Sequence, residues 1–144
     1  FATSSALDLE AILDDDPVKT LTLKLLADRL AEVLAQEAQS LIADLWVERP
    51  RSIIRPAIGY PSWSDHSEKK TLFELLEVKE RIGISLSSSY AMNPPSSVCG
   101  AVIGGEGVRY FTVKDVSRAQ LERYARRKGV PDRELASFLK DMGY

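Results

Sequence analysis

An arginine in a proline-rich segment is the residue of this chain best suited to bind a small ligand. Arg55 opens the segment RPAIGYP, directly after two isoleucines. Its planar guanidinium can donate two parallel hydrogen bonds to a carboxylate. Pro56 and Pro61 restrict φ, which reduces the entropy lost when the loop is ordered. The pattern predicts a pre-organised ligand-binding loop, with a structural ion pair as the alternative role of Arg55.

The same loop contains a glycine and an aromatic residue that can complete a ligand site. Gly59 permits a positive φ or a close approach of the backbone to a ligand. Tyr60 follows it, and free backbone N–H and C=O groups beside an aromatic ring suit an adenine or an amino-acid group. Taken alone, Tyr60 is better explained as a core aromatic residue.

Few other residues offer acid–base, nucleophilic or metal chemistry. His66 is the single histidine and Cys99 the single cysteine, so neither an internal disulfide nor a zinc site built by this chain alone is expected. We predict that His66 is a neutral imidazole packed against the loop, and that Cys99 itself is a small buried hydrophobic residue. The GGEG segment lacks the lysine and the strand-to-helix context of a phosphate-binding loop, so we interpret it as a turn. No catalytic residue is predicted.

The composition narrows the class of protein. A length of 144 residues fits one domain or part of one, and 44% hydrophobic residues suffice for a core. The chain contains 19 Lys and Arg and 21 Asp and Glu. It therefore has no excess of basic residues that would indicate nucleic-acid binding. No apolar run is long enough to cross a membrane, and no signal-peptide pattern opens the chain. A reducing, cytoplasmic location is the expectation.

A long amphipathic helix is predicted to precede the loop. Asp16 is a suitable N-cap and Pro17 a suitable first helical residue, and the periodic pattern continues to Trp46. Polar residues, Glu32 among them, lie opposite its apolar face. That face is predicted to comprise Leu23, Leu26, Leu30, Val33, Leu34, Leu41 and Leu45. A short helix over 7–13 comes before it.

A second helix and a hairpin are predicted after the loop. Asp65 and Glu68 are spaced as a capping box for a helix that ends near Gly83. Segments 98–103 and 108–113 flank the GGEG turn and indicate a β-hairpin.

Two helices are predicted near the end of the sequence. Ser117 and Gln120 form a further capping box, for a helix that ends at Gly129 and whose cations at 126–128 favour the helix dipole. A last short helix covers 131–144. The predicted fold class is α+β: a helix-rich domain with a small twisted antiparallel sheet and one long amphipathic helix.

Several segments resemble one protein family. The segment IRPAIGYP, followed by DHSEK and LFELLEV, is similar to the signature of the C-terminal reactivation (activation) domain of cobalamin-dependent methionine synthase, which binds S-adenosylmethionine. The segments LADRLAE, SYAMNPPSSVCG, YARRKG and the final GY resemble the same family in the same order. The resemblance covers essentially the whole chain. It implies that residues 1–144 are the C-terminal portion of one such domain, whose N-terminal part is absent from this sequence.

The resemblance also implies a set of ligand-binding residues. Arg55 would bind the carboxylate of S-adenosylmethionine, and Glu32 would lie near the cationic end of the ligand. Ala57 would offer its backbone groups to the ligand. The full implied set is Glu32, Arg55, Ala57, Gly59, Tyr60 and Tyr110. No catalytic residue and no metal ligand belong to it.

The implied function is repair of an oxidised cobalamin as part of a methyltransferase. A flavodoxin or a flavoprotein reductase would supply an electron, and this domain would present the methyl group of S-adenosylmethionine. Cobalamin would be held by another domain of the same polypeptide or by a corrinoid protein, and zinc would belong only to a further domain. Because a sulfonium is already an activated methyl donor, the domain needs to supply only binding and alignment.

Two other interpretations stay open. The chain could be a non-catalytic module that docks onto a corrinoid protein or a flavoprotein electron donor without binding S-adenosylmethionine. It could also be a structural fragment without independent activity, since the family's reactivation domain is longer. Neither alternative involves nucleic acid or a membrane.

Overall fold

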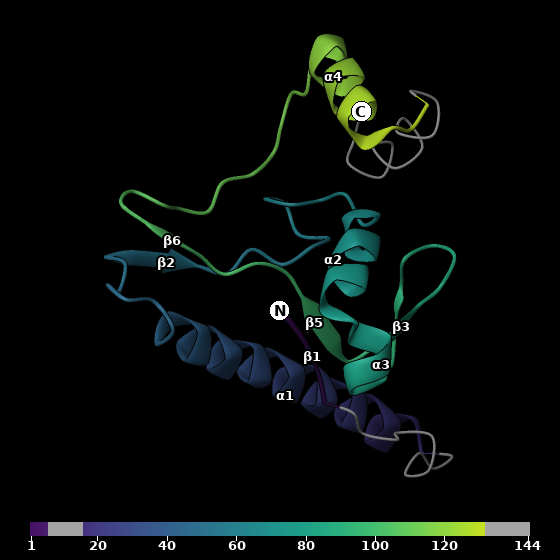
Figure 1. The fold of residues 1–144 in the computed structure, drawn as a ribbon. Coiled ribbons are helices and arrows are strands. Elements are labelled where there is room, and N and C mark those ends of the chain that lie inside the picture. The colour runs from purple at the N-terminus through teal and green to yellow at the C-terminus, as the bar shows by residue number, and fades with distance from the viewer. Residues whose placement is uncertain (6–15, 132–144) are drawn as a thin grey trace.

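The computed structural model describes residues 1–5 and 16–131, and it has the predicted α+β class. The predicted helices over 7–13 and, beyond residue 131, at the end of the sequence lie outside the described residues. Four helices and six short strands follow one another along the described chain (Figure 1). In order they are β1 (Ala2–Ser4), α1 (Pro17–Ala43), β2 (Ser52–Ile54), α2 (Glu68–Leu76), α3 (Val78–Ile82), β3 (Ser85–Leu86), β4 (Met92–Asn93), β5 (Ser97–Cys99), β6 (Ile103–Gly105) and α4 (Arg118–Lys128).

The strands form three antiparallel pairs, and the predicted hairpin is wrong. β1 pairs with β5, β2 with β6, and β3 with β4. Residues 108–113 form no strand, although the Val113 N–H donates to the carbonyl of Pro61 at 2.9 Å. A Cβ on Gly104 would lie 2.4 Å from Cγ of Pro50. At Gly104, therefore, the glycine allows close packing within β6 instead of a hairpin turn.

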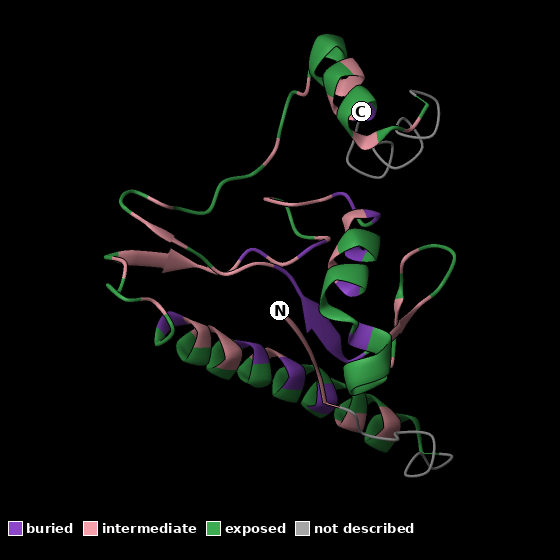
Figure 2. Ribbon diagram, viewed as in Figure 1, coloured by how far each residue is buried: buried purple, intermediate pink, exposed green. Residues whose placement is uncertain are grey.

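Helix α1 packs through its alanines, and the predicted leucine face is wrong. Ala27, Ala31 and Ala35 are at most 1% exposed, and this side of the helix faces β1 and β5 (Figure 2). Most of the predicted apolar face is exposed instead, namely Leu26, Leu30, Val33, Leu34, Leu41 and Leu45. Methyl side chains let the helix backbone approach the strands closely, and a pattern based on large residues misses such a face.

The exposed leucines lead to a solubility prediction. Contiguous apolar surface promotes association. We expect the 144-residue chain to self-associate as its concentration rises, and the pair Leu26→Glu and Leu41→Glu to suppress this, since both leucines are more than half exposed. Multi-angle light scattering over a concentration series measures the effect.

A charge-matched control separates apolarity from charge. Lys24→Gln with Gln36→Glu changes the net charge by the same amount at exposed positions of α1 and removes no leucine. A chain that stays monomeric throughout, or equal suppression by the control pair, would contradict the prediction.

The second helical region differs from its prediction at its start and in its middle, and it ends at Gly83 as predicted. Asp65 accepts a hydrogen bond from the N–H of Ser67 at 2.9 Å, but α2 begins only at Glu68 and its N-cap Ser67 makes no side-chain cap bond. The predicted capping box is therefore wrong. The helix also breaks at Glu77, which has a left-handed φ of 51°, so that α2 and α3 are separate. A core cluster packed with them comprises Ile58, Phe73, Val78, Ile84 and Cys99.

Local capping signals are confirmed at α1 and α4. The Asp16 carboxylate accepts the N–H of Val18 at 2.9 Å, with Pro17 as the first helical residue. Ser117 and Gln120 form the reciprocal capping box of α4, and Gly129 ends that helix with φ 70°. Within residues 1–5 and 16–131, no helix has both the length and the apolar character needed to cross a membrane.

Candidate ligand-binding site

A cleft of about 420 Å³ lies among α1, the loop after β2 and the segment after β6. Its volume falls within the range of small-molecule sites. The lining residues are Glu32, Arg55, Pro56, Ala57, Tyr60, Pro61, Ser62, Tyr110, Phe111 and Thr112. The structure thus brings together five of the six predicted ligand-binding residues, and Gly59 lies just outside the lining.

Arg55 is held in place by its backbone and by one aromatic ring. Its N–H donates to the hydroxyl oxygen of Tyr110 at 2.8 Å. Its guanidinium carbon lies 5.6 Å from the ring centroid of Phe1, within the range of a cation–π contact. The side chain is 17% exposed. These contacts fix the position of Arg55 without using the hydrogen-bonding capacity of its guanidinium.

The guanidinium is incompletely satisfied. Nη2 of Arg55 lies 3.7 Å from a carboxylate oxygen of Glu32, which is longer than a hydrogen bond. Nε of Arg55 is buried and has no hydrogen-bond partner within the described part of the chain. A buried donor without a partner is costly, and a planar anion in the cleft would satisfy it.

Glu32 and Tyr60 line the cleft beside Arg55. Glu32 follows the buried Ala31 on α1, and the Tyr60 hydroxyl donates to it over a long 3.4 Å. Partial burial, together with the charge of Glu32, raises the pKa of Tyr60, so its hydroxyl stays protonated near neutral pH. The periodic pattern predicts Glu32 on the solvent side of the helix. The structure instead places it at the rim of a cleft.

The loop between Ala57 and Trp63 is closed by backbone hydrogen bonds. The N–H of Gly59 donates to the carbonyl of Trp63 at 2.8 Å, and Ala57 forms a β-bridge with Gly100. Gly59 has φ 100°, a conformation that other residues rarely adopt. A Cβ at this position would lie 2.7 Å from Cε1 of His66, so the imidazole does pack against the loop as predicted.

Five lining residues lie outside the ligand-binding set that the sequence predicts. Pro56 and Pro61 stiffen the loop and also line the cleft, and three more residues, Ser62, Phe111 and Thr112, line it without any sequence signal of their own. Each of the five lies within two residues of a predicted member of the set, and this proximity is the signal that could have found them.

One cation of α4 has a role beyond the predicted one. Lys128 is predicted to favour the dipole of its own helix. In the structure it does lie in the last turn of α4, and its ammonium also forms ion pairs with Asp65 and Glu68, which come from a distant part of the sequence.

A larger groove of about 940 Å³ lies between α4 and residues 62–68. Its carboxylates, Asp65 and Glu68, are already paired with Lys128. The smaller cleft is therefore the better candidate for a charged ligand, because Nε of its arginine has no hydrogen-bond partner among the described residues.

Metal and thiol chemistry find no support in the described residues. Across 1–5 and 16–131, no three His, Cys, Asp or Glu side chains lie together as metal ligands. Cys99 is buried as predicted, and its burial raises the pKa of the thiol to about 11. A thiol in that state is a poor nucleophile at neutral pH.

Fold and cleft together define an α+β domain with a site suited to a small ligand that contains a carboxylate. The family described as "Vitamin B12 dependent methionine synthase, activation domain" matches residues 1–129. The chain belongs to this family, as its motifs indicate.

A solved structure gives the same assignment. The crystal structure of the MetH reactivation domain bound to AdoHcy is 34% identical to this chain, with a TM-score of 0.88. The match covers 96% of this chain and 49% of that one. This chain therefore spans about half the length of the protein it matches.

Proposed function

We propose that this chain binds S-adenosylmethionine in the 420 Å³ cleft and serves in the reductive remethylation of cobalamin. One observation carries the proposal: the buried Nε of Arg55 has no hydrogen-bond partner within the described residues. A ligand carboxylate supplies two acceptor oxygens to such a guanidinium. The similar domain whose structure contains AdoHcy supports the choice of ligand, because AdoHcy is the demethylated form of the same molecule.

The residues of the cleft fit the charges of this ligand. Arg55 would hold the carboxylate, and Glu32 would lie near the cationic groups. Backbone groups of Ala57 and the Tyr60 ring would form the wall between them, with Gly59 giving the loop its shape. Tyr110 would contribute its hydroxyl, whose oxygen already accepts the N–H of Arg55. The chain then contributes binding and orientation, and the sulfonium supplies the activated methyl group.

The wider role follows from the family as part of the same proposal. Methionine synthase is a methyltransferase, and the activation domain would meet cobalamin carried by another domain of the same polypeptide or by a corrinoid protein. A flavodoxin or a flavoprotein reductase would supply the electron, in the cytoplasm. Cobalamin and zinc would belong to other domains.

Direct binding tests the proposal. Isothermal titration calorimetry of the 144-residue chain with S-adenosylmethionine, and separately with S-adenosylhomocysteine, is expected to show one site for each. Adenosine, which has no carboxylate, is expected to bind more weakly. If neither full ligand binds, or if adenosine binds as tightly as both, the assignment of the cleft is wrong. The docking-module interpretation would then be the remaining candidate.

A further inference from the structure

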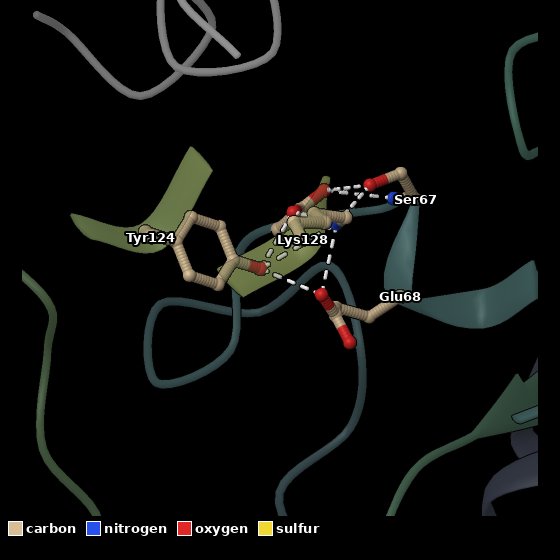
Figure 3. Close-up of polar contacts among 5 residues, drawn as sticks. Ser67, Glu68, Tyr124 and Lys128 are labelled. Atoms are coloured by element: carbon tan, nitrogen blue, oxygen red, sulfur yellow. Dashed lines mark hydrogen bonds and ion pairs between the residues drawn. The ribbon is translucent and has the colours of Figure 1, made fainter. Parts of the chain in front are cut away.

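A buried polar cluster connects α4 to the end of the ligand-site loop. We define the Lys128 cluster as Asp65, Ser67, Glu68, Tyr124 and Lys128. Figure 3 labels the last four of these residues. The ammonium of Lys128 donates to Asp65 and Ser67 and pairs with Glu68 at 2.8 Å. The Tyr124 hydroxyl lies 2.7 Å from one carboxylate oxygen of Asp65 and one of Glu68. Asp65 is 7% exposed and the Lys128 side chain 19%, so water screens these contacts little.

The charges of the cluster favour the bonded state. Burial by itself raises the pKa of Asp65, but hydrogen bonds from Lys128, Ser67 and Tyr124 outweigh it and lower that pKa. Burial lowers the pKa of Lys128, and its bonds to Asp65 and Glu68 again outweigh burial and raise it. The pKa of Tyr124 is raised, by burial first and then by the two carboxylates. Near neutral pH, Lys128 and Tyr124 are therefore donors to the ionised carboxylate of Asp65.

Helix α4 depends on this cluster for its position. Figure 1 shows α4 apart from the other helices, at the end of a long segment without helix or strand. Among the described residues, α4 packs extensively on no other helix or strand, and its small apolar cluster is formed around its own Ala125. The 940 Å³ groove separates it from residues 62–68. Tyr124 and Lys128 cross this separation.

Two walls of the ligand cleft end at the same cluster. The first wall is the loop from the Ala57 bridge to Asp65, closed by the hydrogen bonds of Gly59 and Trp63. The second wall is the segment from β6 to α4, which carries residues 110–112 of the lining. One hydrogen bond, from Val113 N–H to Pro61 O, joins the two walls at 2.9 Å.

We propose that Lys128 and Tyr124 are positioning residues for the ligand site, which hold both walls of the cleft through Asp65 and Glu68. Neither residue belongs to the cleft lining. Their effect is to anchor α4, which keeps residues 110–113 against the loop and the loop closed at Asp65. The effect on affinity rests on the proposed function, whereas the effect on the loop does not.

Hydrogen exchange tests the anchoring without any ligand. In Lys128→Met we expect the amides of Gly59, Trp63 and Val113 to exchange at least about tenfold faster, because local opening requires less free energy. The amide of Ile58, bonded to Cys99 on the strand side, is expected to keep its protection. NMR-detected exchange on the 144-residue chain resolves these four positions.

Three further variants distinguish a specific effect on the position of the loop from a general loss of fold stability. Tyr124→Phe removes one hydroxyl and is expected to give a smaller acceleration of the same amides. Lys128→Arg keeps a cation that can bridge both carboxylates and is expected to stay near wild type. Arg127→Met changes the neighbouring exposed cation outside the Lys128 cluster and is expected to change nothing.

Affinity for S-adenosylhomocysteine is the second measurement. If loss of the anchor leaves about one molecule in ten with a formed cleft, the Kd of Lys128→Met rises about tenfold. Arg127→Met is expected to stay within about twofold of wild type. A wild-type chain that does not bind overturns the proposed function, and the exchange result still decides the anchoring.

The proposal is wrong under two outcomes. The first is unchanged exchange at Gly59, Trp63 and Val113 in both Lys128→Met and Tyr124→Phe. The second is equal acceleration at Ile58 in Tyr124→Phe, which would mean loss of the whole fold's stability instead of loop anchoring. Should Lys128→Met not fold, the exchange rates of Tyr124→Phe decide between anchoring and no anchoring.

Discussion

Replacing Arg55 by alanine is expected to weaken S-adenosylmethionine binding at least tenfold. Charge-assisted hydrogen bonds contribute about 1.5–3 kcal/mol, and about 1.4 kcal/mol corresponds to a tenfold change in Kd. Arg55→Lys keeps the charge but loses the planar pair of donors, so an intermediate loss is expected. Isothermal titration calorimetry measures both, and Arg51→Ala, which changes an exposed arginine directly before β2, is the matched control.

A ligand without a carboxylate isolates the contact itself. Wild type is expected to bind decarboxylated S-adenosylmethionine more weakly than S-adenosylmethionine, and Arg55→Ala is expected to bind it no more weakly than wild type does. The two changes then act on one interaction and are not additive. If Arg55→Ala weakens both ligands by the same factor, the arginine supports the fold of the site and does not hold the carboxylate.

Replacing Gly100 by alanine is expected to destabilise the domain by about 3 kcal/mol or more, which is the scale of a clash that cannot relax. A Cβ at Gly100 would lie 2.2 Å from the carbonyl oxygen of Pro56 and 2.8 Å from Cα of Ala57. Both are backbone atoms, held in place because the N–H of Ala101 donates to the same Pro56 carbonyl at 3.1 Å. Urea unfolding measures the loss.

Gly105→Ala is the matched control for this experiment. Its Cβ would meet only Cγ1 of Val108 at 3.4 Å, an ordinary contact. We expect a change within about 1 kcal/mol there. A Gly100→Ala protein as stable as the Gly105→Ala protein would show that the Ala57 bridge moves freely, and the rigidity assigned to this wall of the cleft would be wrong.

Local chemistry makes parts of the fold predictable. The start of α1 follows from Asp16 and Pro17, and both ends of α4 follow from Ser117 and Gly129, because capping depends on residues within a few positions of each other. The predicted hairpin after Cys99 is wrong for the opposite reason. β5 pairs with β1 from the far end of the chain, and no local pattern encodes such a pairing.

The candidate site, too, can be predicted from local sequence only in part. Arg55 can be selected from residue chemistry, but periodicity places Glu32 in solvent, and only the family resemblance assigns Glu32 and Tyr110 to the ligand. Lys128 and Asp65 lie 63 residues apart in sequence. Their pairing depends on the position of α4, which is set by the path of the segment after β6. The pattern of charges in the sequence therefore cannot predict it.

The alanines of α1 set how closely the helix that carries Glu32 lies against β5. Ala31 and Ala35 share one buried cluster with Val98, and Ala57 packs against it. A longer side chain at either alanine would increase the distance between the axis of α1 and β5. The carboxylate of Glu32, which lies on the same helix, would move by a similar amount. If the cleft binds a sulfonium compound as proposed, the size of these two side chains sets the distance between Glu32 and that ligand, although neither alanine lines the cleft.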